Sequence, residues 1–155
     1  MKTRKVFDSF ALLAYLNLED GYGAVKDFLS AADTLVLINE YNLGEVYYIL
    51  ARGRGPDQAE YFLNTILPSL PLHRSDNTFQ DIIEAAKIKG QYALSYADCF
   101  AVATAIKEKA TVVTGDPEFR KVEGLVGIDW LGGKKEKESI RRLRGDDPAR
   151  RLPGV

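Results

Sequence analysis

The chain has 155 residues, of which 46% are hydrophobic and 28% charged, and this composition suits one globular domain with a buried core. The single cysteine excludes an internal disulfide, and the single histidine excludes a histidine-rich metal site. No apolar run approaches the length of a membrane span, and the first residues lack the apolar segment of a secretion signal, so we expect a cytoplasmic protein.

The formal net charge of −1 is unevenly distributed along the chain. Residues 1–133 carry 13 basic and 18 acidic side chains, whereas residues 134–155 carry 8 basic and 4 acidic ones. We therefore expect a mildly acidic domain over residues 1–133, followed by a basic and flexible tail over residues 134–155. An acidic body argues against a protein that coats duplex nucleic acid by charge alone.

The first half of the chain predicts two strands, each followed by helices. Ser9 and Asn42 are candidate N-caps, and Pro56 suits the first turn of a helix after the RGRGP break. The predicted segments are a strand at 3–8, helices at 10–16 and 23–31, a strand at 34–38, and helices at 42–52 and 56–67.

The second half continues the same alternation. Its predicted segments are a short strand near Leu72, helices at 76–90 and 95–109, a strand at 111–114, a short helix after Asp116, and a strand at 126–131. Strands that alternate with helices favour right-handed crossovers and a mainly parallel sheet, here of about five short strands.

Four carboxylates stand beside apolar runs rather than among polar residues. Each falls at a predicted strand end or helix start, and only the Asp8 segment contains a basic residue, Lys5. These four acids are Asp8 in KVFDSFALLAYL, Glu45 in NLGEVYYIL, Asp98 in SYADCFAVATAI and Asp116 in TVVTGDPEF. Because sites in parallel sheets form at the carboxyl ends of the strands, we expect the four acids to meet in one cleft.

Convergent carboxylates need compensating positive charge. Two of them about 4 Å apart repel by about 4 kcal/mol at an effective dielectric constant of about 20. One or two Mg²⁺ or Mn²⁺ ions would provide that charge, since oxygen ligands suit these ions better than zinc. The chemistry to expect is metal-assisted hydrolysis of a phosphodiester. Ser9, Asn42 and Thr114 lie close to the acids in sequence and are candidates to orient the ligands.

Ordinary structural roles stay open for each of these residues. Asp8 and Asp116 could cap helices, Glu45 could be a solvated helix residue, and Asp98 could interact with a helix dipole. Four tyrosines could stack on nucleic-acid bases, pack between helices or contact a partner protein: Tyr41, Tyr47, Tyr48 and Tyr92. The arginines Arg52 and Arg54, expected in a loop, could contact phosphate or simply be solvated.

Four segments together resemble the PIN domain family and, within it, the VapC-type toxins of toxin–antitoxin pairs. They are FDSFALLAYL, NEYNLGEVYYIL, LSYADCFAVATAIKEKATVVTGDPEF and GIDWL, and the resemblance covers roughly residues 3–131. The resemblance implies a three-layer α/β/α fold and a single-strand-selective endoribonuclease. It also implies Mg²⁺ or Mn²⁺ at the four acids, with Ser9 and Thr114 as supporting hydroxyls. A small antitoxin partner and a homodimer would follow from the same resemblance.

Two other functions remain open at this point. One is a PIN-like module that no longer cuts and serves a regulatory complex, although all four acids are present. The other is a structure-specific DNA nuclease, although the chain has no insertion long enough for a helical arch. An aspartyl phosphatase is a more distant possibility, because Asp8-Ser9-Phe10 lacks the second acid of a D-x-D motif.

Overall fold

The structure, a computed structural model, describes residues 2–132, and its strands form one sheet. The sheet has the order β3-β2-β1-β4-β5, and every neighbouring pair is parallel. The strands are β1 (Thr3–Phe7), β2 (Thr34–Asn39), β3 (His73–Ser75), β4 (Thr111–Thr114) and β5 (Ile128–Trp130). The predicted α/β fold with about five short strands is confirmed, and the sheet is parallel throughout.

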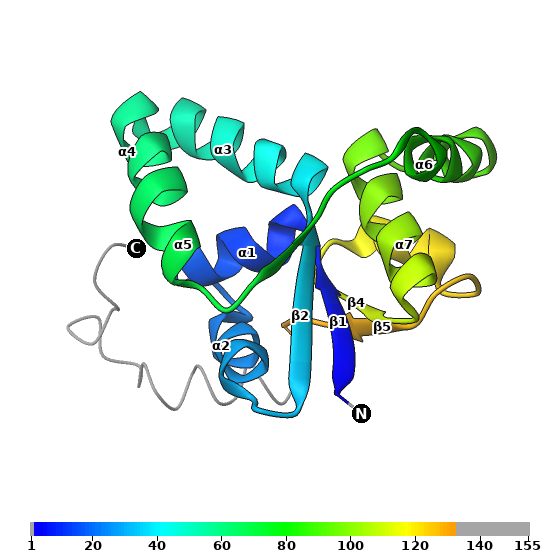
Figure 1. Ribbon diagram of the computed structural model, residues 1–155, viewed down its shortest axis with the longest axis horizontal. Helices are drawn as coiled ribbons and strands as arrows, with labels where there is room; N and C mark the ends of the chain where they lie inside the picture. The colour runs from blue at the N-terminus through cyan, green and yellow to red at the C-terminus, as the bar shows by residue number, and fades with distance from the viewer. Residues whose placement is uncertain (1, 133–155) are drawn as a thin grey trace.

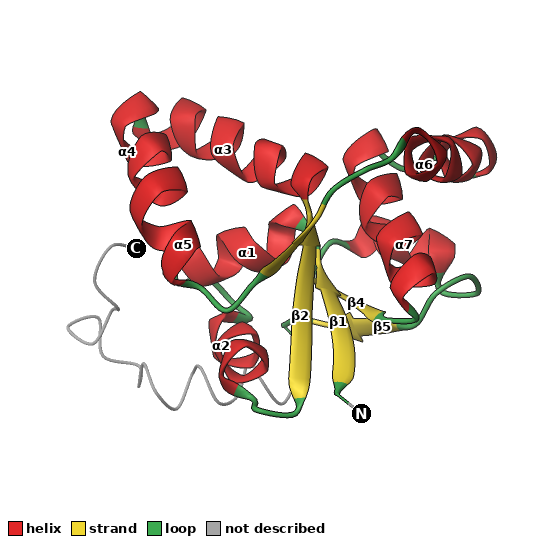
Figure 2. Ribbon diagram, in the orientation of Figure 1, coloured by secondary structure: helices red, strands yellow, loops and turns green. Residues whose placement is uncertain are grey.

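Helices cover both faces of the sheet, which gives the predicted three layers (Figures 1 and 2). One face packs against α1 (Ser9–Leu16), α2 (Tyr22–Ser30), α3 (Glu40–Arg54), α4 (Pro56–Tyr61), the π-helical η1 (Phe62–Ile66) and α5 (Leu67–Ser69). The other face packs against α6 (Phe79–Gln91), α7 (Tyr96–Glu108) and the 3₁₀ helix η2 (Pro117–Val122).

Each central strand contributes to both cores, as expected when successive side chains point to opposite faces. In β1, Val6 packs with α6 and α7, whereas its neighbour Phe7 packs with α1–α5. In β4, Val112 and Val113 divide in the same way. This burial on both faces explains why β2 appears in the sequence as a nearly continuous apolar run, TLVLI.

The side of the sheet on which new strands are added changes between β1 and β4, although all strands stay parallel. From β1 the chain moves outward to β2 and β3, and it then returns to add β4 and β5 on the other side of β1. Ligands of open α/β sheets bind in the crevice at the carboxyl ends of two neighbouring strands whose following connections go to opposite sides. Asp8 follows β1 directly, and Asp116 lies two residues beyond β4.

Three predicted helix starts are wrong because a nearby residue caps the helix instead. The side chain of Asp8, not Ser9, caps α1, and the side chain of Asn39, not Asn42, caps α3. Thr78, not the predicted start at 76, caps α6 through a reciprocal capping box. In each case the capping residue has extended backbone geometry, as an N-cap requires.

Several predicted helix and strand ends are also wrong. The helix α3 continues through Arg54 and ends at Gly55 (φ +94°), so Arg52 and Arg54 lie in its last turn rather than in a loop. Gly90 lies inside α6, and β3 begins at His73. The predicted tail at 134–155 falls outside the described residues. Over residues 2–132, no helix is both long and apolar enough to cross a lipid bilayer.

Candidate functional site

Asp8 is the most buried of the four acids, with 1% of its surface exposed. Its Oδ1 accepts a hydrogen bond from the Ala11 N–H at 2.8 Å, and its Oδ2 accepts one from the Thr114 hydroxyl at 2.5 Å. Burial raises the pKa of Asp8 from 3.8 to about 8. The two hydrogen bonds lower that pKa in part, while the charges of Asp98 and Asp116 raise it further.

Asp98 occupies the first turn of α7, where the Ser95 side chain caps the helix by accepting from the Asp98 N–H at 3.1 Å. Burial is the main cause that raises the pKa of Asp98 from 3.8 to about 6. A hydrogen bond with Ser95 lowers this pKa, and the charges of Asp116, Glu45 and Glu118 raise it. Three other carboxylates are therefore electrostatic neighbours of Asp98.

Glu45 lies on α3 and approaches the site from the helix that follows β2. The hydroxyl of Ser9, in the first turn of α1, donates a hydrogen bond to Glu45 Oε1. One turn before Glu45, the buried Asn42 donates from Nδ2 to the carbonyl of Ala97 at 2.9 Å. This bond joins α3 to α7 next to Asp98, and Asn42 Oδ1 has no hydrogen-bond partner in the described part of the chain.

Asp116 caps η2, because its Oδ1 accepts from the Glu118 N–H at 3.0 Å. Its own N–H donates to the hydroxyl oxygen of Thr114 at 3.0 Å, so the hydroxyl that contacts Asp8 also holds the Asp116 backbone. Glu118 is an acid that the sequence analysis missed. The sequence does contain a signal for it: Glu118 follows the helix start Asp116-Pro117, and acids are enriched in the first turn of a helix.

The four acids thus lie on neighbouring elements at the carboxyl edge of the sheet, and Coulomb interactions couple their side chains. None of them forms an ion pair with a lysine or arginine within residues 2–132. They do not form a closed coordination shell, because no three His, Cys, Asp or Glu side chains in that range are arranged to hold a metal ion. The donor chemistry fits a divalent cation all the same: the donors are carboxyl oxygens without a basic partner in residues 2–132, and Mg²⁺ retains several waters and needs few protein ligands.

The sequence matches one family model, and the fold matches several solved structures. The model of the PIN domain matches residues 5–125. The chain belongs to the PIN domain family. No curated protein matches this PIN domain in sequence.

Several solved structures share the fold of this PIN domain. VapBC2 from Rickettsia felis, bound to a DNA fragment from its promoter, is 18% identical, covers 83% of this chain and 99% of its own, and has a TM-score of 0.67. VapC20 from Mycobacterium tuberculosis, a Sarcin-Ricin loop cleaving toxin, is 17% identical, covers 79% and 95%, and has a TM-score of 0.63. At these identities the similarity establishes the fold.

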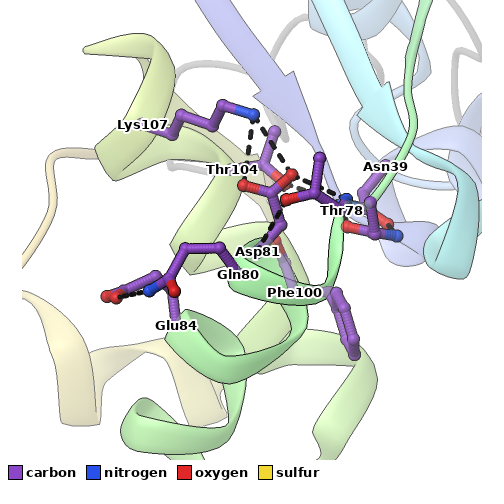
Figure 3. Close-up of polar contacts among 9 residues, drawn as sticks. Asn39, Thr78, Gln80, Asp81, Glu84, Phe100, Thr104 and Lys107 are labelled. Carbon is purple, nitrogen blue, oxygen red and sulfur yellow. Dashed lines mark hydrogen bonds and ion pairs between the residues drawn. The ribbon is translucent and has the colours of Figure 1, made fainter.

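A separate cavity of about 410 Å³ lies beside β2, α6 and α7, and none of the four acids lines it. Asn39 is buried at its wall and exchanges amide hydrogen bonds with Asn77 at 2.8 and 3.0 Å. Asn39 also donates to Thr104 at 2.9 Å and accepts from the Tyr41 N–H at 2.8 Å, while Lys107 pairs with Asp81 nearby (Figure 3). Both polar atoms of the Asn39 side chain have hydrogen-bond partners. The network therefore joins the end of β2 to α7 and to the segment before α6.

Proposed function

We propose that this PIN domain hydrolyses phosphodiester bonds in single-stranded RNA and requires one or two Mg²⁺ or Mn²⁺ ions. One observation carries the proposal: two buried carboxyl groups with raised pKa values, Asp8 and Asp98, face further acids with no basic partner in residues 2–132. An arrangement of this kind is unfavourable for folding alone. It becomes favourable when a divalent cation neutralises the acids.

The four acids would hold the cation, which when bound polarises the phosphate and makes its water ligand more acidic. The rest of the work belongs to the chain. The Thr114 hydroxyl fixes the direction of the Asp8 carboxylate, and the Ser9 hydroxyl does the same for Glu45. Asn42 ties α3 to the first turn of α7, which sets the spacing between Glu45 and Asp98. These contacts orient the oxygen ligands before substrate arrives.

We also propose that the protein is the toxin of a toxin–antitoxin pair, acts in the cytoplasm and forms a homodimer. Similar structures support the antitoxin partner, since they include a toxin–antitoxin complex from Klebsiella pneumoniae and DNA-bound VapBC from Salmonella typhimurium. Growth arrest on expression, relieved by co-expression of a small protein encoded beside it, is the expected result. A cell that tolerates the active protein alone would contradict the toxin role.

The test of the activity is cleavage of labelled single-stranded RNA with Mn²⁺, with Mg²⁺ and with EDTA. We expect cleavage with either ion, none with EDTA, and a loss of at least about 100-fold in Asp98→Asn, since even residues that only orient metal ligands are worth about 10–100-fold. The matched control is Asp57→Asn, an exposed acid in the first turn of α4, which keeps full activity. RNA left intact by the wild type would favour the non-cleaving module, and preferential cleavage of DNA would favour a DNA nuclease.

A further inference from the structure

Two tyrosines and an arginine share one face of α3 with Glu45. Tyr41, Glu45, Tyr48 and Arg52 follow one another at intervals of four, three and four residues, so they form a single stripe along the helix. The two rings are 45% and 44% exposed. Glu45 is therefore flanked on its own helix face by two aromatic rings that are nearly half exposed.

Both rings are held in place by other side chains. Tyr41 stacks on Phe100 with ring centroids 4.4 Å apart and planes 9° apart, and Tyr96 lies against it at 5.8 Å. The guanidinium of Arg52 lies over the ring of Tyr48, 5.1 Å from its centroid. Ordered rings lose little conformational entropy when a planar ligand stacks on them, so the stripe is preorganised for binding.

Arg52 adds a charge that the rest of the site lacks. It forms no ion pair with a carboxylate within residues 2–132, although the body of the protein is acidic. A guanidinium that has no carboxylate partner and lies on the same helix face as Glu45 has a natural counterpart in the phosphate of a nucleic acid. The other tyrosines named from the sequence have different contacts: the Tyr47 hydroxyl donates to Glu60, and Tyr92 packs against the core.

We infer that this stripe is a stacking track for unpaired nucleotides, in which Tyr41 and Tyr48 each hold a base on opposite sides of Glu45 and Arg52 contacts a phosphate. The inference rests on the proposed nuclease function and names the residues that select its substrate. Seven residues of helix place the Cα atoms of Tyr41 and Tyr48 about 10 Å apart along the helix axis, roughly three times the rise between stacked bases. A track with that spacing suits a splayed single strand and not a stacked duplex.

A second protein chain is the competing occupant of an exposed aromatic face. Glu45 lies between the two rings, so a chain that covered them would also cover this acid and close the site. A nucleic-acid substrate has to lie over the acid in order to react. The charge of Arg52, which has no carboxylate partner in residues 2–132, favours the phosphates of RNA as the occupant.

The test measures the affinity of the full-length protein for a short, fluorescein-labelled, single-stranded RNA by fluorescence anisotropy. Ca²⁺ replaces Mn²⁺, and a gel verifies that the RNA stays intact. We expect Tyr41→Ala and Tyr48→Ala each to weaken binding at least about fivefold, the lower end of what one base–aromatic stack contributes. Tyr41→Phe retains the ring and the affinity. Tyr61→Ala is the matched control, because Tyr61 is 54% exposed on α4, outside the stripe, and it leaves binding unchanged.

The remaining outcomes separate this inference from the proposed function. Unchanged RNA affinity in both alanine variants would overturn the track. The track would also be overturned if the alanine variants kept normal RNA affinity but had a lower oligomer mass by light scattering. The stripe would then be a subunit interface. If the variants lose affinity but the wild type fails to cleave RNA with Mn²⁺, the track stands and the nuclease proposal fails.

Discussion

Replacing Asp8 with asparagine removes a buried carboxyl group while preserving its shape and its cap on α1. The wild-type carboxyl has its pKa raised from 3.8 to about 8, chiefly by burial. Below pH 3.8 the folded and unfolded chains both carry the proton. Between pH 3.8 and about 8 the unfolded chain releases it while the folded chain retains it, so the free energy of unfolding falls as pH rises.

The size of this effect follows from the same numbers. About three pH units separate 3.8 from neutrality, and each corresponds to about 1.4 kcal/mol, so Asp8 lowers the stability of the metal-free protein by about 4 kcal/mol at pH 7. Asparagine carries no charge at any pH and still accepts from the Ala11 N–H. We therefore expect Asp8→Asn to be as stable as the wild type near pH 4 and more stable at pH 7–8, by about 10 °C in Tm.

Urea denaturation in EDTA at several pH values measures this difference directly. The variant should have a flatter dependence of stability on pH and no RNA cleavage. Adding Mn²⁺ should stabilise the wild type by about 2.7 kcal/mol at one hundred times the dissociation constant, and should stabilise the variant less. An Asp8→Asn protein that is less stable than the wild type at pH 8 in EDTA would refute the reasoning, because the carboxylate would then be a net stabilising group.

Three further substitutions test the contacts around the site. Thr114→Val removes the hydroxyl that orients Asp8 and should reduce cleavage by about 10–100-fold, whereas Thr114→Ser restores it; equal rates in the two variants would contradict the assigned role. Gly115→Ala places a methyl group against the ring of Phe10 and should cost about 1–3 kcal/mol in urea denaturation; the cost should shrink in a Phe10→Ala background, and an unchanged cost would contradict the clash. Asn39→Ala should cost about 3 kcal/mol, because it removes the cap of α3 and the buried amide network; a change under about 1 kcal/mol in the same assay would argue against that network.

The sheet could be predicted because its strands are buried on both faces. The segment 34–38 is a nearly continuous apolar run and 111–114 is rich in β-branched residues. Both are flanked by helix signals, and a parallel α/β sheet readily combines the two patterns. The right-handed crossover rule predicts the strand order only in part. It does not show on which side of β1 a later strand joins the sheet. The change of side between β1 and β4 became visible only in the structure.

Helix starts were harder to predict because several residues near each start can serve as a cap. Asn39 and Asn42 both have a capping side chain, and the choice depends on where β2 releases the backbone from its extended form. Pairing of Asn39 with Ser75 in β3 keeps residue 39 extended, which makes it the cap. The π-helical turn at Phe62–Ile66 has no local signal at all, since it reflects packing against the core.

For the acids, the sequence analysis treated helix capping and metal binding as alternatives, and the structure shows why the two are compatible. Asp8 and Asp116 each cap a helix through one carboxylate oxygen, yet a carboxylate has about four lone-pair sites, so capping leaves acceptor capacity for a cation. A backbone N–H that holds one oxygen also fixes the direction of the other. Helix N-termini favour negative charge, so they stabilise the ionised form of these capping carboxyl groups. Capping is then the means by which the chain would orient its ligands before any ion binds, and the metal role of the four acids stays a prediction that the Mn²⁺ experiments decide.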